Sequence, residues 1–488
     1  MKTNMLRLLA LLLALMMVLP IVACADDTEE PVIDDPSDVD DPDGGEEEKE
    51  DDPYNVPDSI PDLYFNGEQF DIMYFKDLFL PLFYVGEKTG DLIDDAVFNA
   101  IAKTEERFGV QIVAFSPGSG SEMEFTNAVN NQITTGTVEF DMVQMHDVQG
   151  GNLSVQGRFL NAHKLPNLDF SKPWWSEKAI DSLSYMGQLY LISSTLSYNS
   201  MGSTSVMFFN KDMLTDYNME IPYQQVLDMD WYFEDLLTEL ADIYQDTNDN
   251  GKDDQDIYGI VYPQEFYAWY ESFGINLVEK SEDGMELIFN ANDERAYTLL
   301  DLIYTSIYDT DGGFKGARAD MKNMFLQQQA LYIPTSLSSA VQEFRNCEFK
   351  YGIVPYPMLD EEQGTYLSGY TERFMAVPYT CEDTEFVGTI IESMSAEGYR
   401  QVLPAYYETA LKGRYTHDDE SVQMLEIIRE ARVIDFAYVY GNDMCCSRGL
   451  YSRIKDQSRD YASYVEGLRS AGEARLEELT TVFTEMAD

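Results

Sequence analysis

The chain has 488 residues, a net charge of −56 and an apolar fraction of 44%. At about 150 residues per domain, this length and composition suit two or three domains or one large two-lobed body. The acidic excess is not confined to one segment. Such a surface repels phosphate backbones, so nucleic acid is a poor partner.

The first 24 residues predict an export signal. Lys2 and Arg7 give a positive start, and an unbroken apolar run follows from Leu8 to Leu19. That run is shorter than the about 20 residues that a membrane-spanning helix needs. The residues Ile-Val-Ala-Cys at 21–24 resemble the lipobox of bacterial lipoproteins, which implies a lipid on Cys24. An ordinary secretory signal with an incidental Cys24 is the alternative.

Residues 25–62 are dominated by acidic residues, Pro and Gly, with few large apolar side chains. Self-repulsion extends such a segment, and it cannot form a core. We therefore expect an acidic disordered tether here and a folded body that begins near Leu63.

The body opens with alternating strands and helices. Strands are predicted at Phe70–Phe75, Val110–Phe115 and Phe140–Met145, and helices at Asp94–Phe108 and Phe125–Ile133. Strands that alternate with helices indicate parallel βαβ units. Further along, a strand is predicted at Ile257–Tyr262 and a short one at Leu331–Ile333. Helices are predicted at 291–308, 321–331, 384–395, 418–432 and 462–486.

Four blocks of sequence carry a family resemblance. They are SYMGQLYLIS at 184–193, VMFFNKDML at 206–214, MDWYFEDLLTEL at 229–240 and YGIVPYPM at 351–358. Their order and spacing resemble those of family 1 extracellular solute-binding proteins, the receptors of ABC importers related to the maltose-binding protein. The resemblance covers residues 63 to about 440. It implies an α/β, type II periplasmic-binding-protein fold, in which a multi-strand hinge joins two αβ lobes with a cleft between them.

By this resemblance, the first lobe comprises 63–195 plus 366–415 and the second 200–350 plus 425–488. The receptor would capture a small solute, a sugar or oligosaccharide, by hinge closure and deliver it to the permease subunits of an ABC importer. A lipid anchor would hold it on the extracellular face of the cell membrane. A Gram-positive host is favoured, because a diffusible receptor would be lost there. The alternative is a surface lipoprotein that acts as an adhesin or sensor partner without transport.

An enzyme is not expected. The sequence contains no GxSxG, P-loop, GxGxxG or HExxH motif, and its three histidines, His146, His163 and His417, lie far apart. No certain cofactor is predicted.

In folds of this kind, ligands bind at the carboxyl ends of strands, in the cleft. His146 and Asp147 end the third predicted strand. The carboxylate can accept hydrogen bonds from hydroxyl groups, whereas His146 has a structural turn role as its alternative. Sugar rings also stack on aromatic side chains, for which core packing is the alternative role. The remaining candidate ligand residues are Tyr198, Trp269, Tyr270, Ser336 and Tyr370.

One acidic loop resembles part of a calcium site. Asp246, Asn248 and Asn250 occupy positions 1, 3 and 5 of a calcium-binding loop, and Gly251 falls at its turn. Position 12 is Ile257 rather than an acid; Asp254 and Asp256 lie beside that position, and Asp254 is the fourth candidate ligand. Calcium is thus one interpretation of this loop, and a polar turn stabilised by its own side chains is the other. The cysteines Cys347, Cys381, Cys445 and Cys446 could pair outside the cell, in a pattern that the sequence leaves open.

Overall fold

The computed structural model describes residues 52–76, 84–118, 120–264, 266, 268–290, 293–411, 419–441 and 447–487. Residues Pro53–Asp488 form one compact unit. The export signal, Cys24, the tether up to residue 51, His417, Cys445 and Cys446 lie outside the described residues, as does the side chain of Tyr198.

The first sheet has four strands in the order β13-β3-β1-β2. Its strands are β1 (Glu68–Tyr74), β2 (Val110–Phe115), β3 (Met142–His146) and β13 (Arg373–Ala376). β1 pairs in parallel with both β2 and β3, which confirms the predicted βαβ units. β13 comes from much later in the chain and pairs antiparallel to β3.

The second sheet runs in the order β11-β4-β10-β6-β5, with β9 beside β6. Its strands are β4 (Ser205–Asn210), β5 (Tyr244–Gln245), β6 (Ile257–Pro263), β9 (Gly313–Gly316), β10 (Ala330–Ser336) and β11 (Tyr351–Val354). Both of its faces are buried. Val206 and Phe208 of β4 pack in one hydrophobic core, and Met207 and Phe209 pack in another. Alternate residues of a strand point to opposite faces, so an unbroken apolar strand is suited to this place.

Two pairs of short strands complete the β-structure: β7 (Val278–Lys280) with β8 (Leu287–Phe289), and β12 (Ser368–Gly369) with β14 (Arg432–Val433). The longer helices are α2 (Leu92–Phe108), α3 (Glu122–Thr135), α4 (Asp147–Val155), α9 (Phe233–Leu240), α11 (Glu294–Tyr304), α12 (Arg318–Leu326), α14 (Thr384–Glu397), α15 (Leu403–Leu411), α16 (Asp419–Ala431), α18 (Ser447–Lys455) and α19 (Tyr461–Ala487).

The remaining helical segments are short. They are α5 (Glu177–Leu183), α6 (Tyr198–Gly202), α7 (Lys211–Asp216), α8 (Tyr223–Leu227), α10 (Trp269–Ser272), α13 (Ser338–Val341), α17 (Phe436–Tyr440), the 3₁₀ turns η1 (Ala162–Lys164), η3 (Phe344–Asn346) and η4 (Glu361–Gln363), and the π-turns η2 (Thr305–Asp309) and η5 (Gly398–Val402).

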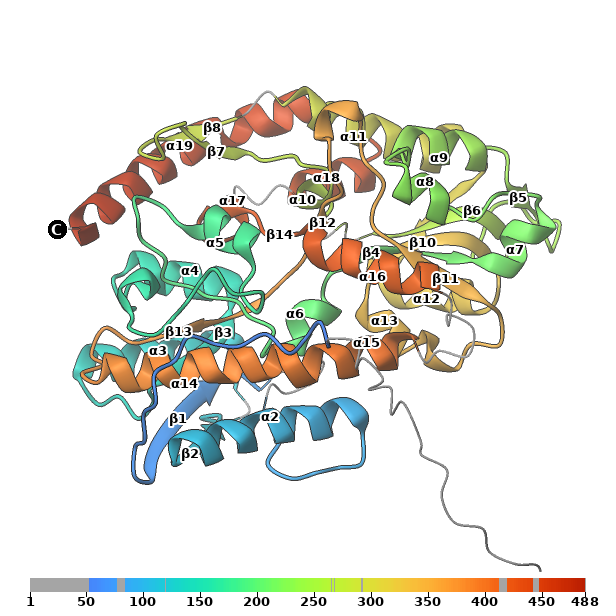
Figure 1. Cartoon of the computed structure of the whole chain (residues 1–488). Helices are drawn as coiled ribbons and strands as arrows, with labels where there is room; N and C mark the ends of the chain where they lie inside the picture. The colour runs from blue at the N-terminus through green and yellow to red at the C-terminus, as the bar shows by residue number, and fades with distance from the viewer. Residues whose placement is uncertain are drawn as a thin grey trace, which may run out of the picture. The chain divides into compact units, whose positions relative to one another are not determined.

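Local signals explain where the first helices begin and end. The Asp91 carboxylate caps α2 by accepting hydrogen bonds from two backbone N–H groups, and Gly109 ends the helix in the left-handed conformation at φ 61°. Ser121 and Glu124 form a capping box at the start of α3. Figure 1 shows α2 and α14 side by side along the first sheet.

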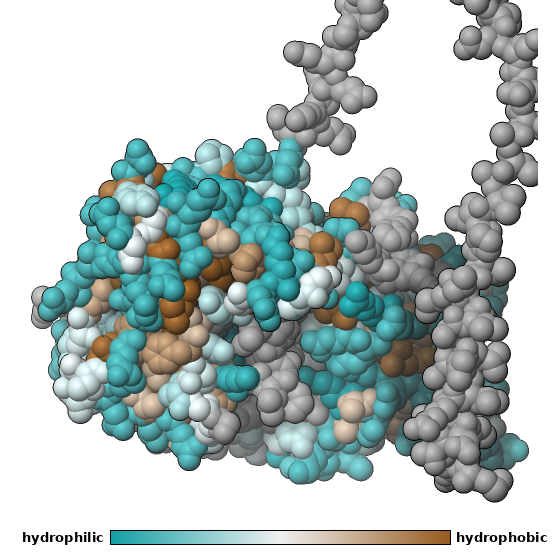
Figure 2. Space-filling view, turned by 90° about the horizontal axis from the view of Figure 1, so that it is seen from below, coloured by the Kyte–Doolittle hydropathy of each residue, from teal (hydrophilic) through white to brown (hydrophobic). Residues whose placement is uncertain are grey.

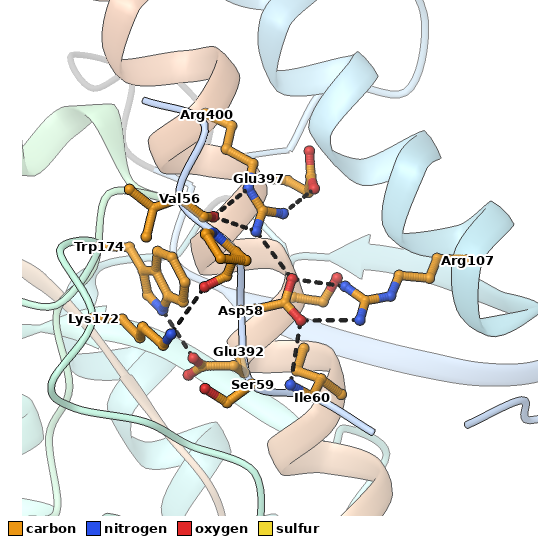
Figure 3. A network of polar contacts seen from close by, with 12 residues as sticks. Val56, Asp58, Ser59, Ile60, Arg107, Lys172, Trp174, Glu392, Glu397 and Arg400 are labelled. Carbon is orange, nitrogen blue, oxygen red and sulfur yellow. Dashed lines mark hydrogen bonds and ion pairs between the residues drawn. The ribbon is translucent and has the colours of Figure 1, made fainter. Parts of the chain in front are cut away.

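The folded unit starts earlier than the boundary at Leu63 predicted from the sequence. Ile60 is buried in the first core, and the Asp58 carboxylate forms ion pairs with Arg107 of α2 and Arg400 of η5 (Figure 3). Arg400 also donates to the Val56 carbonyl. Residues 53–62 therefore pack on the folded body, because the acidic segment meets two arginines there.

The C-terminal part departs from the predicted lobe boundary too. The sequence placed 425–488 wholly in the second lobe, but α17 packs against α4, which follows β3 of the first sheet. The early α19 residues Tyr461 and Val465 lie in the second core, whereas Phe483 contacts the rings of Tyr185 and Tyr190. α19, red in Figure 1, thus contacts both halves of the unit.

The surface is mainly hydrophilic, as the highly charged composition predicts. Figure 2 shows hydrophilic side chains over most of the visible face, with hydrophobic residues in small patches between them. Among the described residues, no helix is both long and apolar enough to span a bilayer.

Candidate ligand site

The candidate site forms at the carboxyl ends of two strands from different sheets. Asp147 is the first residue of α4, directly after β3. Glu271 lies in α10, a few residues beyond the end of β6. Carboxyl ends of strands are where open αβ sheets bind ligands. The segment that starts with Gly369 connects the two strand ends: the Gly369 N–H donates to the Ser272 hydroxyl of α10 at 2.9 Å, and the Glu372 N–H donates to Asp147 at 3.3 Å.

Asp147 is fully buried and held from three sides. Its Oδ1 accepts a hydrogen bond from the Val148 N–H at 2.8 Å and lies against His146 Nδ1. Its Oδ2 accepts from the Glu372 N–H at 3.3 Å. Glu122 of α3 approaches His146 Nδ1 at 3.6 Å. The predicted pair of His146 and Asp147 therefore stands at the strand end as one unit.

The segment between β12 and β13 adds a second carboxyl. Glu372 is 1% exposed; it accepts a hydrogen bond from the Ser193 hydroxyl and one from the Arg373 N–H at 2.7 Å. Burial raises the pKa of Glu372 to about 7, although the nearby Arg432 charge opposes that rise. Arg432 lies over the Tyr370 ring, 4.0 Å from its centre. Tyr370 thus lies near Glu372, where its ring supports the Arg432 guanidinium.

Two further buried carboxyls complete the cluster. Asp435 accepts hydrogen bonds from the Ala437 and Tyr438 N–H groups at the start of α17, and burial raises its pKa to about 6. Glu271 is 7% exposed, and burial followed by the charges of Asp435 and Asp147 raises its pKa to about 8. We call Asp147, Glu271, Glu372 and Asp435 the carboxyl cluster.

The other predicted ligand residues have different surroundings. Trp269 is 3% exposed and packs among the rings of Phe233, Tyr262, Phe266, Phe273 and Tyr356. Tyr270 is fully buried and packs edge-on against Tyr461. The structure therefore places both aromatics in the second core. Ser336 ends β10 and shares a hydrogen bond with Ser338 at 2.9 Å.

Sequence reasoning missed Glu271, Glu372, Asp435 and Arg432. Glu271 and Glu372 lie within two residues of the predicted Tyr270 and Tyr370. With 88 acidic residues in the chain, no single carboxyl gave a signal. Only the fold brings these four segments together.

The carboxylate oxygens of the acidic loop at 246–256 accept hydrogen bonds from other groups of the same loop. Asp246 accepts from the N–H groups of Asn248, Asn250 and Gly251, and Asp253 accepts from the side-chain amides of Asn248 and Asn250. Asp254 is exposed, and Asp256 is buried instead. Among the described residues, no group of three or more His, Cys, Asp or Glu side chains is arranged to hold a metal ion. These contacts describe a polar turn stabilised by its own side chains, and calcium binding by this loop stays a prediction.

Two αβ lobes with this strand order define a periplasmic-binding-protein fold, and solved structures confirm that class. An ABC substrate-binding protein from Listeria monocytogenes, solved with cycloalternan, matches with a TM-score of 0.52 and 14% identity over 83% of this chain and 99% of that chain. The GacH receptor of Streptomyces glaucescens, solved unliganded and with acarbose, matches with a TM-score of 0.53 and 16% identity over 85% and 98%.

The galacto-N-biose/lacto-N-biose I-binding protein of a Bifidobacterium longum ABC transporter, solved with lacto-N-biose, matches with a TM-score of 0.54 and 10% identity over 85% of this chain and 98% of that chain. No protein-family model matches the sequence, and no curated protein matches it. At these identities the likeness concerns the fold. The chain has the fold of maltose-binding-protein-like solute-binding proteins, as the sequence blocks predicted.

Proposed function

We propose that this protein is an extracellular solute-binding receptor of an ABC importer, which captures a sugar or oligosaccharide and delivers it to a permease. The observation that carries the proposal is the carboxyl cluster, because it gathers buried acceptor groups at the carboxyl ends of β3 and β6. Carboxylates at such a place suit the hydroxyl groups of a sugar. The neighbours solved with cycloalternan, acarbose and lacto-N-biose support the solute class.

The receptor would work by hinge closure. Open and closed forms exchange, and a solute that contacts groups on both lobes shifts the population toward the closed form. The lipobox-like residues at 21–24 support a lipid anchor at Cys24, and the acidic residues after it support a tether between the membrane and the folded unit. The chain's own chemistry in this role is binding, with no reaction step.

A thermal-shift screen of neutral, amino and acidic saccharides tests the proposal. A solute at 100 times its Kd stabilises the protein by about 2.7 kcal/mol, which raises the melting temperature by several degrees. We expect at least one saccharide to do so, and Asp147→Asn to remove most of that rise. Asn keeps the shape of the buried side chain, whereas Ala would leave the Glu372 N–H unpaired.

Asp254→Asn is the matched control, because Asp254 is exposed in the 246–256 loop. It should keep the full response. A protein whose melting temperature responds to no saccharide would instead favour the adhesin or sensor role. Uptake of the identified saccharide by cells with and without this protein tests delivery to a permease.

A further inference from the structure

Arg432 is a buried cation with two unused donor nitrogens. It is the first residue of β14 and is 6% exposed. Its guanidinium lies over the Tyr370 ring, 4.0 Å from the ring centre, and its Nη1 donates at 3.3 Å to the Met201 sulfur, a weak acceptor. Its Nε and Nη2 are buried, and no described residue accepts a hydrogen bond from either. We call this side of the guanidinium the open edge of Arg432.

The open edge lacks an acceptor that the protein needs there. An arginine keeps its charge in proteins, and a buried charged donor without an acceptor costs free energy. The charge of Arg432 acts on Glu372, but that carboxyl accepts its hydrogen bonds from Ser193 and from the Arg373 N–H. The described chain therefore leaves the open edge to a group from outside.

Glu271 Oε2 also lacks a donor among the described residues, but its surroundings differ. A Cβ atom on Gly369 would lie 3.0 Å from the Glu271 Cβ, so Glu271 packs against one face of β12. Ser368 and Tyr370 flank Gly369 and point to the opposite face, and Arg432 is the register partner of Ser368. A buried carboxyl can also become neutral by binding a proton, whereas Arg432 cannot lose its charge.

The shape of the open edge indicates which group it binds. Nε–H and one N–H of Nη2 are parallel and coplanar, which matches the two oxygens of a carboxylate. A hydroxyl oxygen would accept from only one of them. A doubly charged phosphate would meet twice the repulsion from the carboxyl cluster. The Ser368 hydroxyl is fully buried, has no partner among the described residues and lies on the same face, so it offers a further donor.

The open edge lies among the segments that join the two sheets. The chain passes from β3 of the first sheet to β4 of the second through the segment that contains α6 and Met201, and it returns from β11 to β13 through the segment that contains β12 and Tyr370. Junctions between lobes are common places for solute sites. Access to so buried a position requires the lobe separation that the proposed hinge closure includes.

We propose that the captured solute is an acidic saccharide whose carboxylate binds side-on to Nε and Nη2 of Arg432. This inference rests on the proposed function and narrows its solute class. The Tyr370 ring holds the guanidinium in place before the solute arrives, which lowers the ordering cost of binding. Ser368 adds a hydroxyl donor, and the hydroxyl groups of the same solute remain available to the carboxyl cluster.

The test compares saccharides that differ only at the carboxyl group. Oligogalacturonides and aldobiouronic acids are each measured against their methyl esters of the same length. In at least one series, we expect the acid form to bind the full-length protein at least about tenfold more tightly than the ester in calorimetry at pH 7. Arg432→Lys keeps a positive charge but lacks the planar fork, and should reduce the preference to less than about threefold. Arg432→Gln should abolish it.

Arg429→Lys is the matched control. Arg429 lies one helical turn before Arg432, and its Nε pairs with Glu426 at 2.9 Å. This variant should keep the full preference for the acid form. Circular dichroism and the melting temperature show whether each variant folds.

Equal affinity of the unmodified protein for acid and ester in both series would overturn the inference, and this comparison needs no variant. A full preference in Arg432→Lys or Arg432→Gln would overturn it too. If neutral saccharides bind and acid forms bind no more tightly than their esters, this inference fails and the proposed receptor function stands. If no saccharide of any kind binds, both fail.

Discussion

Asp58 is a single carboxylate that holds an N-terminal segment on the folded body. Its two oxygens accept hydrogen bonds from Arg107 at 2.8 and 2.9 Å, and Arg400 donates at 3.1 Å (Figure 3). Burial opposes ionisation of this group, but the two arginines outweigh it and lower its pKa to about 2. The carboxylate thus stays charged at neutral pH in a largely buried place.

Replacing Asp58 by Asn should destabilise the protein by about 2–4 kcal/mol at pH 7, because both arginines lose a charged acceptor. Urea unfolding monitored by tryptophan fluorescence measures the change. The folded pKa lies below the ordinary value of 3.8, so this contribution is present above pH 4 and is lost as the pH falls toward 2.

Asp62→Asn is the control for that experiment. Asp62 is exposed in the same segment, and its removal should change the free energy of unfolding by less than about 0.5 kcal/mol. Equal effects of the two substitutions would mean that the ion pairs of Asp58 contribute nothing specific.

The buried pair of Trp174 and Trp175 shares a hydrogen-bond acceptor that the sequence alone could not identify. Both indole N–H groups donate to the Glu392 carboxylate, at 3.1 and 3.0 Å. Two adjacent tryptophans stand out in the sequence, but their shared partner lies 218 and 217 residues away, on α14. Pairings of this kind depend on the fold, because the residue types alone allow too many partners.

Among the elements, the β7–β8 hairpin makes an unusual contact. It follows α10, and the Lys280 Nζ of β7 donates to three carbonyls at the end of α5, those of Asp181, Ser182 and Ser184, each at 2.6 Å. Burial lowers the pKa of Lys280 to about 8. A cation at a helix C-terminus also favours the helix dipole. The hairpin thereby connects the end of α5 to the segment that follows β6 and α10.

Lys280→Met should lower the free energy of unfolding by about 1–3 kcal/mol, because three carbonyls lose their donor. Hydrogen exchange of the α5 amides should speed up more than that of α14, which the lysine does not contact. Lys164→Met, at an exposed position, serves as the control and should leave both rates unchanged. A general loss of protection in both helices would contradict a local role for Lys280.

The boundaries of many elements could be predicted, and the reason is local. β2 was predicted with its observed ends, and α2, α14 and α19 to within a few residues, since alternation, caps and glycine stops act within one turn. The site could be predicted only in part. Asp147 lies at the end of a strand, a position that the sequence pattern predicts. Glu271 and Asp435 become candidate site residues only because the fold brings them near residues of other segments.

At the scale of the whole molecule, buried acids set the pH dependence of stability. The pKa values of Glu271, Glu372, Glu392 and Asp435 are raised to about 8, 7, 7 and 6. Burial is the first cause in each case. Because the folded state binds these protons more tightly than the unfolded state, their contribution is complete below about pH 4 and is lost as the pH rises through the folded values.

We therefore expect the melting temperature of the solute-free protein to fall between pH 5 and pH 8. Glu392→Gln should reduce this fall, since one of the groups that titrates disappears. Glu385→Gln on the same helix is the control, because Glu385 is exposed and should leave the slope unchanged. A melting temperature that rises steadily from pH 5 to pH 8 would contradict the assignment.

The position of α19 makes it suitable for a measurement of the proposed hinge closure. Its 27 residues span about 40 Å at 1.5 Å per residue, and the helix contacts the second core near Tyr461 and the first lobe near Phe483. If the lobes rotate, as the proposed hinge closure requires, a stiff rod fixed at both ends must bend, slide or release one end. A spin or fluorescent label at the exposed Glu485, paired with one near the second core, would therefore report the rotation that the proposed hinge closure requires.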